Sequence, residues 1–172
     1  MPNWCKGNIR LRGRRNAIVE FLKNELESTG YDRLEDGPVT GTLEINDEYD
    51  EVSVKIPEDK RDLLFAAFYI KGTRRNFIDG KDISVYMDNE DADEVHTICI
   101  DDFRAAWHID PEPYVTKSER YGIDIRILGF ERGMQFIQDI EIIKGKLVNE
   151  TYTTYDELVD WVWKCPMPHM GG

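Results

Sequence analysis

The first clear pattern along the chain is a strict alternation of apolar and polar side chains close to the N-terminus. In "CKGNIRLRG" (5–13) the odd positions hold Cys, Gly, Ile, Leu and Gly, whereas the even positions hold Lys, Asn and two Arg. A period of two is typical of a strand with one buried and one solvated face. The period then changes to that of a helix over about 14–29, which Gly30 ends. The apolar stripe of this helix consists of Ile18, Phe21, Leu22 and Leu26.

Short alternating runs predict two hairpins in the middle of the chain. The first consists of "GTLEI" (41–45) and "EVSVKI" (51–56), joined by the polar residues between them. The second consists of "KGTRRNFI" (71–78) and "DISVYM" (82–87), which flank Asp79-Gly80, a dipeptide favoured in hairpin turns. Both hairpins indicate antiparallel pairing.

The remaining segments alternate between helix and strand patterns. Pro57 introduces "EDKRDLLFAAF" (58–68), whose acidic start and apolar stripe are typical of a short helix begun by proline. The later patterns predict a strand over 94–107, a helix over about 111–121, strands over 123–131 and 134–148, and a last helix near 154–163. These elements favour an α+β fold with a largely antiparallel sheet.

The N-terminal residues also carry a resemblance to a known family. "MPNWC" (1–5), followed by the strand to Gly13, resembles the start of the YubB-type ferredoxin-like proteins of bacteriophages, prophages and plasmids. The segments 69–78 and 97–148 resemble later blocks of that family, although Arg74-Arg75 stand where the family often has Lys-Trp. The resemblance implies a ferredoxin-like sheet with helices packed on one face, and it implies no activity, cofactor or catalytic residue.

On this basis we expect two parts. Residues 1–148 would form the ferredoxin-like domain with insertions, and residues 149–172 would form a C-terminal helix and tail that packs on it or extends from it.

Acidic residues outnumber basic ones by 34 to 22, which gives a formal net charge of −12. The acidity is concentrated in the middle of the chain, since residues 41–110 hold 18 Asp and Glu against 8 Lys and Arg. Such a balance disfavours a protein whose whole surface lies on nucleic acid or anionic lipid. The three widely spaced cysteines do not form a disulfide pattern, and no long apolar run is present, so we expect a cytoplasmic protein without a membrane partner.

The sequence supports two hypotheses about function. In the first, a mobile-element protein binds a basic surface of a host protein and imitates nucleic-acid phosphates with an acidic segment. The candidate residues are Asp88, Glu90, Asp91, Asp93 and Glu94. In the second, the polar face of the first strand binds nucleic acid directly, a function that also needs stacking aromatic rings. The candidate basic residues are Lys6, Arg10, Arg12 and Arg126.

Motifs of catalysis and cofactor binding are missing from the sequence, so an enzyme is the less favoured class and no cofactor is expected. Trp4, Cys5 and Trp107 are interpreted as structural residues of the core.

Cys99 lies an odd number of residues from His96 and His108 on the same predicted strand, which places it on the opposite face and disfavours a metal site. The soft ligands of the tail, Cys165, Met167, His169 and Met170, give only a weak copper(I) signal, and no metal is predicted.

Overall fold

The computed structural model describes residues 3–29, 42–46, 48, 50–56, 66–88, 91 and 93–154. Of these residues, 59% lie in strands and 17% in helices. The predicted helix after Pro57 falls mostly outside the described residues, as does the predicted helix near 154–163 and the cysteine- and methionine-containing tail. No described helix has the length and apolar character needed to cross a bilayer.

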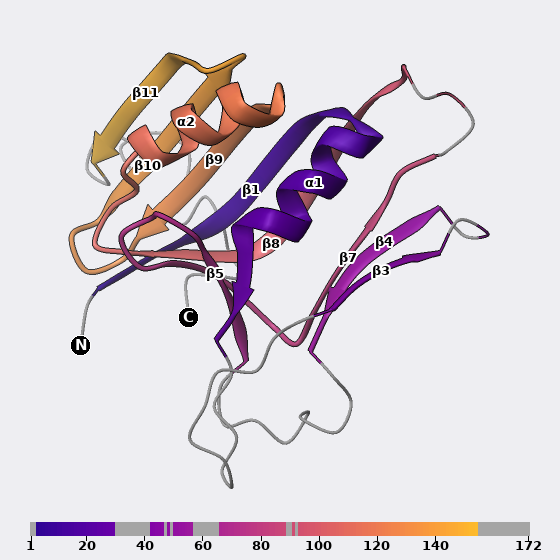
Figure 1. The fold of residues 1–172 in the computed structure, drawn as a ribbon. Coiled ribbons are helices and arrows are strands. Elements are labelled where there is room, and N and C mark those ends of the chain that lie inside the picture. Colours follow the sequence, from indigo (N-terminus) through magenta and orange to yellow (C-terminus); the bar gives the residue numbers. More distant parts are fainter. Residues whose placement is uncertain are drawn as a thin grey trace, which may run out of the picture.

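Eight of the described strands form one antiparallel sheet (Figure 1). Its central strand is β1 (Trp4–Arg14), which confirms the alternation at the N-terminus and pairs with a strand on each side. The order across the sheet is β11-β10-β9-β1-β8-β6-β5-β2. The other members are β2 (Leu26–Ser28), β5 (Ala67–Ile70), β6 (Asn76–Asp79), β8 (Val95–Ala106), β9 (Asp124–Glu131), β10 (Phe136–Ile143) and β11 (Lys146–Thr154).

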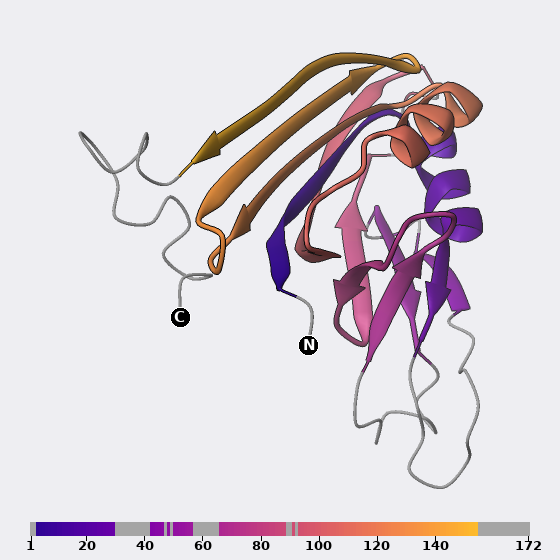
Figure 2. The same ribbon diagram turned by 90° about the vertical axis from the view of Figure 1, so that its left-hand side faces the viewer.

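Two helices, α1 (Arg15–Glu25) and α2 (Glu112–Tyr121), pack on the same side of this sheet. Figure 2 shows both helices to the right of the curved sheet, and no described helix covers its other side. The odd positions of β1 point toward the helices, and Cys5, Ile9 and Leu11 are fully buried there. We refer to the two sides as the helix-bearing face and the helix-free face.

A second, three-stranded sheet has the order β3-β4-β7. The predicted hairpin of β3 (Thr42–Asn46) and β4 (Glu51–Lys55) is confirmed. The prediction that the strands on either side of Asp79-Gly80 pair with each other is wrong, because β6 pairs with β5 and β8, whereas β7 (Asp82–Tyr86) pairs with β4. The chain passes from one sheet to the other at Gly80, whose φ of 133° is accessible to glycine and not to other residues. The dipeptide is therefore a crossover between sheets.

The predicted fold class, an α+β ferredoxin-like fold, is also wrong. The described residues form two sheets with many strands and only two helices, so the fold is rich in β structure. The additional strands come from segments that were not predicted to be separate strands. Leu26–Ser28 leaves the predicted helix and pairs with β5, and Ala67–Ile70 becomes a strand in place of a helix end.

The predicted single strand over 134–148 is a hairpin of β10 and β11. Its two-residue turn consists of Lys144 and Gly145, with φ values of 47° and 73°, as a type I′ turn requires. The expected boundary between residues 148 and 149 falls inside β11, which pairs with β10 as far as Thr154.

The two helices are joined by a buried ion-pair network at the end of α1. The carboxylate of Glu25 is 3% exposed and lies 2.7 Å from the Lys117 Nζ and 3.1 Å from the Arg120 Nη1, both in α2. The Tyr121 hydroxyl donates a hydrogen bond of 2.7 Å to the same carboxylate. The network ties the helix of the N-terminal half to the helix of the C-terminal half.

This network makes a prediction about pH. Burial by itself would raise the pKa of Glu25, but the hydrogen bonds from Lys117 and Tyr121 and the charges of Lys117 and Arg120 outweigh it and lower the pKa. A carboxyl group with a lowered pKa stabilises the fold above its unfolded pKa of about 4.3, and this stabilisation is lost as the pH falls through the folded value. We expect the free energy of unfolding to fall below about pH 4.5, and to fall less steeply in Glu25→Gln, as measured by urea denaturation at several pH values. Equal slopes for the two proteins would contradict this assignment.

Candidate functional site

The helix-free face of the large sheet carries a row of aromatic and basic side chains across neighbouring strands. The register places Lys6 of β1 beside Arg104 of β8, Arg104 beside Phe77 of β6, and Phe77 beside Tyr69 of β5. Trp4 precedes Lys6 by two residues and therefore lies on the same face. The neighbour of Phe77, Asn76, faces the helices, since its amide donates a hydrogen bond of 2.7 Å to the Tyr114 hydroxyl of α2.

These residues form a compact group that we call the aromatic cluster: Trp4, Tyr69 and Phe77, with Arg75 and Arg104. The Trp4 and Phe77 rings meet edge to face with their centroids 6.1 Å apart, and the Tyr69 and Phe77 centroids are 5.6 Å apart. The guanidinium of Arg104 lies 4.3 Å from the Trp4 ring centroid and 5.1 Å from that of Phe77. The Arg75 guanidinium lies 5.6 Å from the Trp4 ring. All three rings are only half-buried, so part of their surface is left for a ligand.

The charges around the aromatic cluster are partly compensated. The Nε of Arg104 forms an ion pair of 2.6 Å with the Oδ1 of Asp79, which fixes the guanidinium between the rings. Burial raises the pKa of Asp79, although the charges of Arg104 and Lys6 oppose that effect. Lys6 and Arg75 are exposed, and within the described part of the chain neither forms an ion pair. Two cations thus border the rings without an ion pair to any carboxylate that the structure describes.

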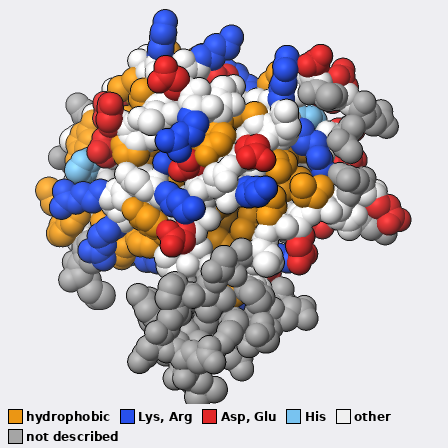
Figure 3. All heavy atoms as spheres, in the orientation of Figure 1, with side chains coloured by type: hydrophobic (Ala, Val, Ile, Leu, Met, Phe, Trp, Pro, Cys, Tyr) orange, Lys and Arg blue, Asp and Glu red, His pale blue; other side chains and the backbone are white. Residues whose placement is uncertain are grey.

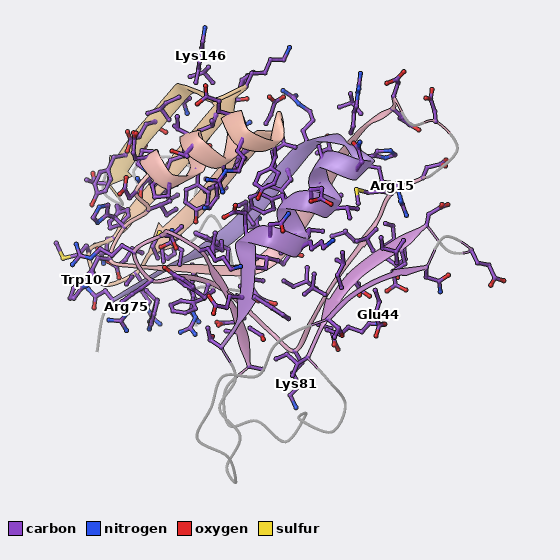
Figure 4. The ribbon with its side chains drawn as sticks, viewed as in Figure 1. Arg15, Glu44, Arg75, Lys81, Trp107 and Lys146 are labelled. Carbon is purple, nitrogen blue, oxygen red and sulfur yellow. The ribbon has the colours of Figure 1, made fainter. Side chains whose placement is uncertain are left out.

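Arg75 is held in position by its backbone. Its φ is 58°, a left-handed conformation that is uncommon outside glycine, and its carbonyl accepts a hydrogen bond of 3.2 Å from the Ala106 N–H. Figure 4 shows Arg75 and Trp107 at the same end of the sheet. Backbone strain of this kind persists where the surroundings fix the conformation.

The structure places the four predicted basic residues on one face, as the alternation indicated. They differ in their contacts, because two of them are held in ion pairs. Arg12 is bound to Asp124 through its Nη2 at 2.8 Å and its Nε at 2.9 Å. Arg126 makes the same kind of pair with Asp139. Lys6 lies beside the aromatic cluster, whereas Arg10 lies four residues further along β1.

The predicted acidic residues lie in the connection between β7 and β8. Asp88, Asp91, Asp93 and Glu94 are exposed, and Glu90 lies outside the described residues. Asp93 forms an ion pair of 3.0 Å with Arg14 at the end of β1, in which both side chains are largely in solvent. Surface pairs of this kind contribute little to stability. On the visible helix-bearing face, acidic and basic side chains are interspersed (Figure 3).

The residues interpreted as structural differ from one another. Cys5 is fully buried, and burial, reinforced by the charge of Glu131, raises the pKa of its thiol to about 12, which makes it unreactive. Trp4 is half-buried on the helix-free face and belongs to the aromatic cluster, so the prediction that it is a residue of the core is wrong. Trp107 is 49% exposed with a φ of 74°, so the prediction that it is a core residue is wrong. Its exposure arises where β8 ends and the chain turns toward α2.

Metal-ligating residues do not gather in the described part of the chain, where no group of three or more His, Cys, Asp or Glu is arranged to hold an ion. Cys99 pairs with Arg10 in register, whereas His96 pairs with Gly13, which faces the helices. The prediction that the cysteine and this histidine lie on opposite faces is confirmed. Burial raises the pKa of the Cys99 thiol, and a hydrogen bond from Arg10 opposes this shift.

Tyr69, Arg75, Phe77 and Arg104 are the functional candidates that sequence reasoning missed. The two rings come from β6 and β5, which lie on the far side of β8 from β1. Two features of the sequence point to the cluster. Trp4 and Lys6 are two residues apart on one strand and therefore share a face, and aromatic residues stand on both sides of "KGTRRN" (71–76). Comparison with protein-family models, with curated proteins and with solved structures finds no match for this chain.

Proposed function

We propose that this protein binds single-stranded nucleic acid, with the aromatic cluster on the helix-free face as the stacking platform. The observation that carries the proposal is the grouping of Trp4, Tyr69 and Phe77 with Arg75 and Arg104 on one sheet face. Unpaired bases stack on aromatic rings and on guanidinium planes, and the face of a sheet presents such groups side by side. A double helix would hide its base faces from this surface.

The charge of the chain sets the expected strength of the interaction. A net charge of −12 opposes binding to a polyanion at long range, so the affinity must come from stacking and from a few local cations. Lys6 and Arg75 border the rings and have no ion-pair partner in the residues the structure describes. For two phosphate contacts, the logarithm of the binding constant should fall with the logarithm of salt concentration with a slope of about −1.4.

The alternative hypothesis, an acidic protein that binds a basic host surface, rests on composition. The acidic residues are exposed, but the ion pair of Asp93 with Arg14 directs one of them back to the protein. The aromatic cluster gives the nucleic-acid hypothesis a specific contact surface that the acidic hypothesis lacks. We place the activity in the cytoplasm of a bacterial host, in agreement with the absence of a disulfide pattern from the sequence.

The proposal predicts a loss of binding when one ring is removed. Phe77→Ala should weaken the affinity for an eight-nucleotide single strand by about 5- to 150-fold, which corresponds to the 1–3 kcal/mol of one stacked base. Phe77→Leu, which keeps the apolar volume and removes the ring, should act in the same direction. Fluorescence anisotropy with labelled thymidine and uridine strands measures the affinity and separates DNA from RNA. Thermal melting of each variant verifies that it is folded.

Tyr86→Ala is the matched control, because Tyr86 is 71% exposed and lies on β7 of the smaller sheet, outside the aromatic cluster. Its affinity should stay within about twofold of the parent, since surface substitutions have small effects. Equal losses for the Phe77 and Tyr86 variants, or tighter binding to duplex than to single strands, would refute the proposal. Salt-sensitive binding to polylysine that Asp91→Lys with Asp93→Lys abolishes, without strand binding by the parent, would favour the acidic hypothesis.

A further inference from the structure

A second feature lies further along β1 on the same helix-free face. A hollow of about 150 Å³ is lined by Arg10 and Arg12 of β1, Asp124 and Arg126 of β9, and Glu141 of β10. Arg10 lies four residues from Lys6, which is about 13 Å along a strand. A stacked single strand advances about 3.4 Å per nucleotide, so about four nucleotides separate this hollow from the aromatic cluster.

Three of the five charged side chains in the hollow already have an ion-pair partner: Arg12 and Asp124 pair with each other, and Arg126 pairs with Asp139 outside the lining. Asp124 accepts hydrogen bonds from Arg12 and from the backbone N–H of Lys144. Arg126 binds both carboxylate oxygens of Asp139 in the bidentate manner. Each guanidinium uses two of its five N–H groups in its pair, and both are held in fixed orientations.

Two side chains in the lining remain without an ion pair to any described residue. Arg10 lies opposite Cys99 of β8 in the register, and Glu141 is half-buried opposite Arg126. Because β9 lies between their strands, Arg10 and Glu141 are two strands apart, about 10 Å in the plane of the sheet. The hollow therefore offers the Arg10 guanidinium on one side and the Glu141 carboxylate on the other, with Arg126, which is bound to Asp139, on the strand between them.

The chemistry of this pair is matched by one nucleobase in particular. A phosphate gains little from a hollow in which carboxylates offset the guanidiniums. Guanine has two adjacent acceptors, N7 and O6, which fit a bidentate guanidinium, and this is the commonest specific contact of arginine with DNA. It also has two adjacent donors, N1–H and the N2 amino group, which fit the two oxygens of a carboxylate. No other standard base has both a double-acceptor edge and a double-donor edge.

We propose that this hollow recognises a guanine base of the bound strand, with Arg10 at N7 and O6 and Glu141 at N1 and N2. This inference rests on the proposed function, since it assigns a base preference to the same face. Recognition at the hollow and stacking at the aromatic cluster involve different residues, so each can be removed while the other is measured.

The test compares eight-nucleotide thymidine strands that carry one guanine or one adenine at each position in turn. We expect guanine at the preferred position to bind about tenfold more tightly than adenine, the scale of one bidentate contact. Inosine, which lacks the N2 amino group, should recover only part of this advantage. Glu141→Gln and Arg10→Lys should each reduce the guanine advantage to less than about threefold, where the advantage is taken relative to the all-thymidine strand bound by the same variant. Glu44→Gln, on the separate small sheet (Figure 4), is the matched control and should keep the full preference.

A guanine advantage below twofold at every position would overturn the inference, and binding of the all-thymidine strand would show that the proposed function survives. A guanine advantage that Glu141→Gln leaves intact would also overturn it. Absence of binding to the all-thymidine strand, by contrast, would refute the proposed function itself.

Discussion

Replacement of Glu25 by alanine is expected to lower the free energy of unfolding by about 3–5 kcal/mol, the usual cost of removing one partner of a buried ion pair. The Lys117 side chain is 8% exposed and lies 2.7 Å from this carboxylate. In the alanine variant its ammonium group stays in the interior without a counter-charge. The Tyr121 hydroxyl loses its hydrogen-bond acceptor at the same time. The loss should appear as a lower midpoint in urea denaturation.

Two further variants test whether the loss of stability in Glu25→Ala comes from the burial of the unpaired charge. Glu44→Ala removes an ion pair of 3.0 Å with Lys55 on the small sheet, where the Glu44 side chain is 57% exposed, and should cost no more than about 1 kcal/mol. Glu25→Leu combined with Lys117→Met replaces both buried charges by apolar groups and should be close to neutral. If Glu25→Ala were as stable as Glu44→Ala, the network between α1 and α2 would have no role in holding the helices together.

The elements that the sequence predicted well are those in which the pattern is local. The alternation over 5–13 and 94–107 predicted β1 and β8, and the proline-initiated helix over 111–121 is α2. Each depends on the period of its own residues, which sterics and burial determine within one segment. These segments form the centre of the sheet and one of its covering helices.

The pairing between strands was much harder to predict from the sequence. Asp79-Gly80 has the composition of a hairpin turn, yet its flanking strands enter different sheets. A period of two determines which side chains share a face but not which strand lies alongside, because pairing partners depend on contacts distant in sequence. For the same reason, the alternation predicted the face on which Lys6 lies but not the residues of the aromatic cluster beside it. Phe77 lies on β6, which pairs with β8, and Tyr69 lies on β5, which pairs with β6. No local pattern could predict either pairing.

The most severe change that we expect comes from a single methyl group in the N-terminal motif. Gly7 lies on β1 beside Gly129 of β9, and the pairing of β1 with β8 is irregular between Gly7 and Ile9. A Cβ at Gly7 would lie 1.7 Å from the carbonyl oxygen of Leu128 and 2.9 Å from the Cα of Gly129. Both are backbone atoms of the neighbouring strand, which cannot rotate away as a side chain would.

Gly7→Ala should therefore destabilise the fold by more than about 3 kcal/mol, above the usual range for overpacking in a core. Gly13→Ala, whose Cβ would meet the Cγ2 of Ile123 at 2.8 Å, should be milder because a side chain can move. Gly122→Ala, at the end of α2, has no atom within 4 Å of the new Cβ and has a φ of 65°, so it should cost about 1 kcal/mol from backbone strain alone. Circular dichroism melting of the three variants gives the ranking. A Gly7→Ala protein as stable as Gly122→Ala would show that β1 and β9 are not in this register, and the positions of Lys6 and Trp4 on the helix-free face would have to be reconsidered.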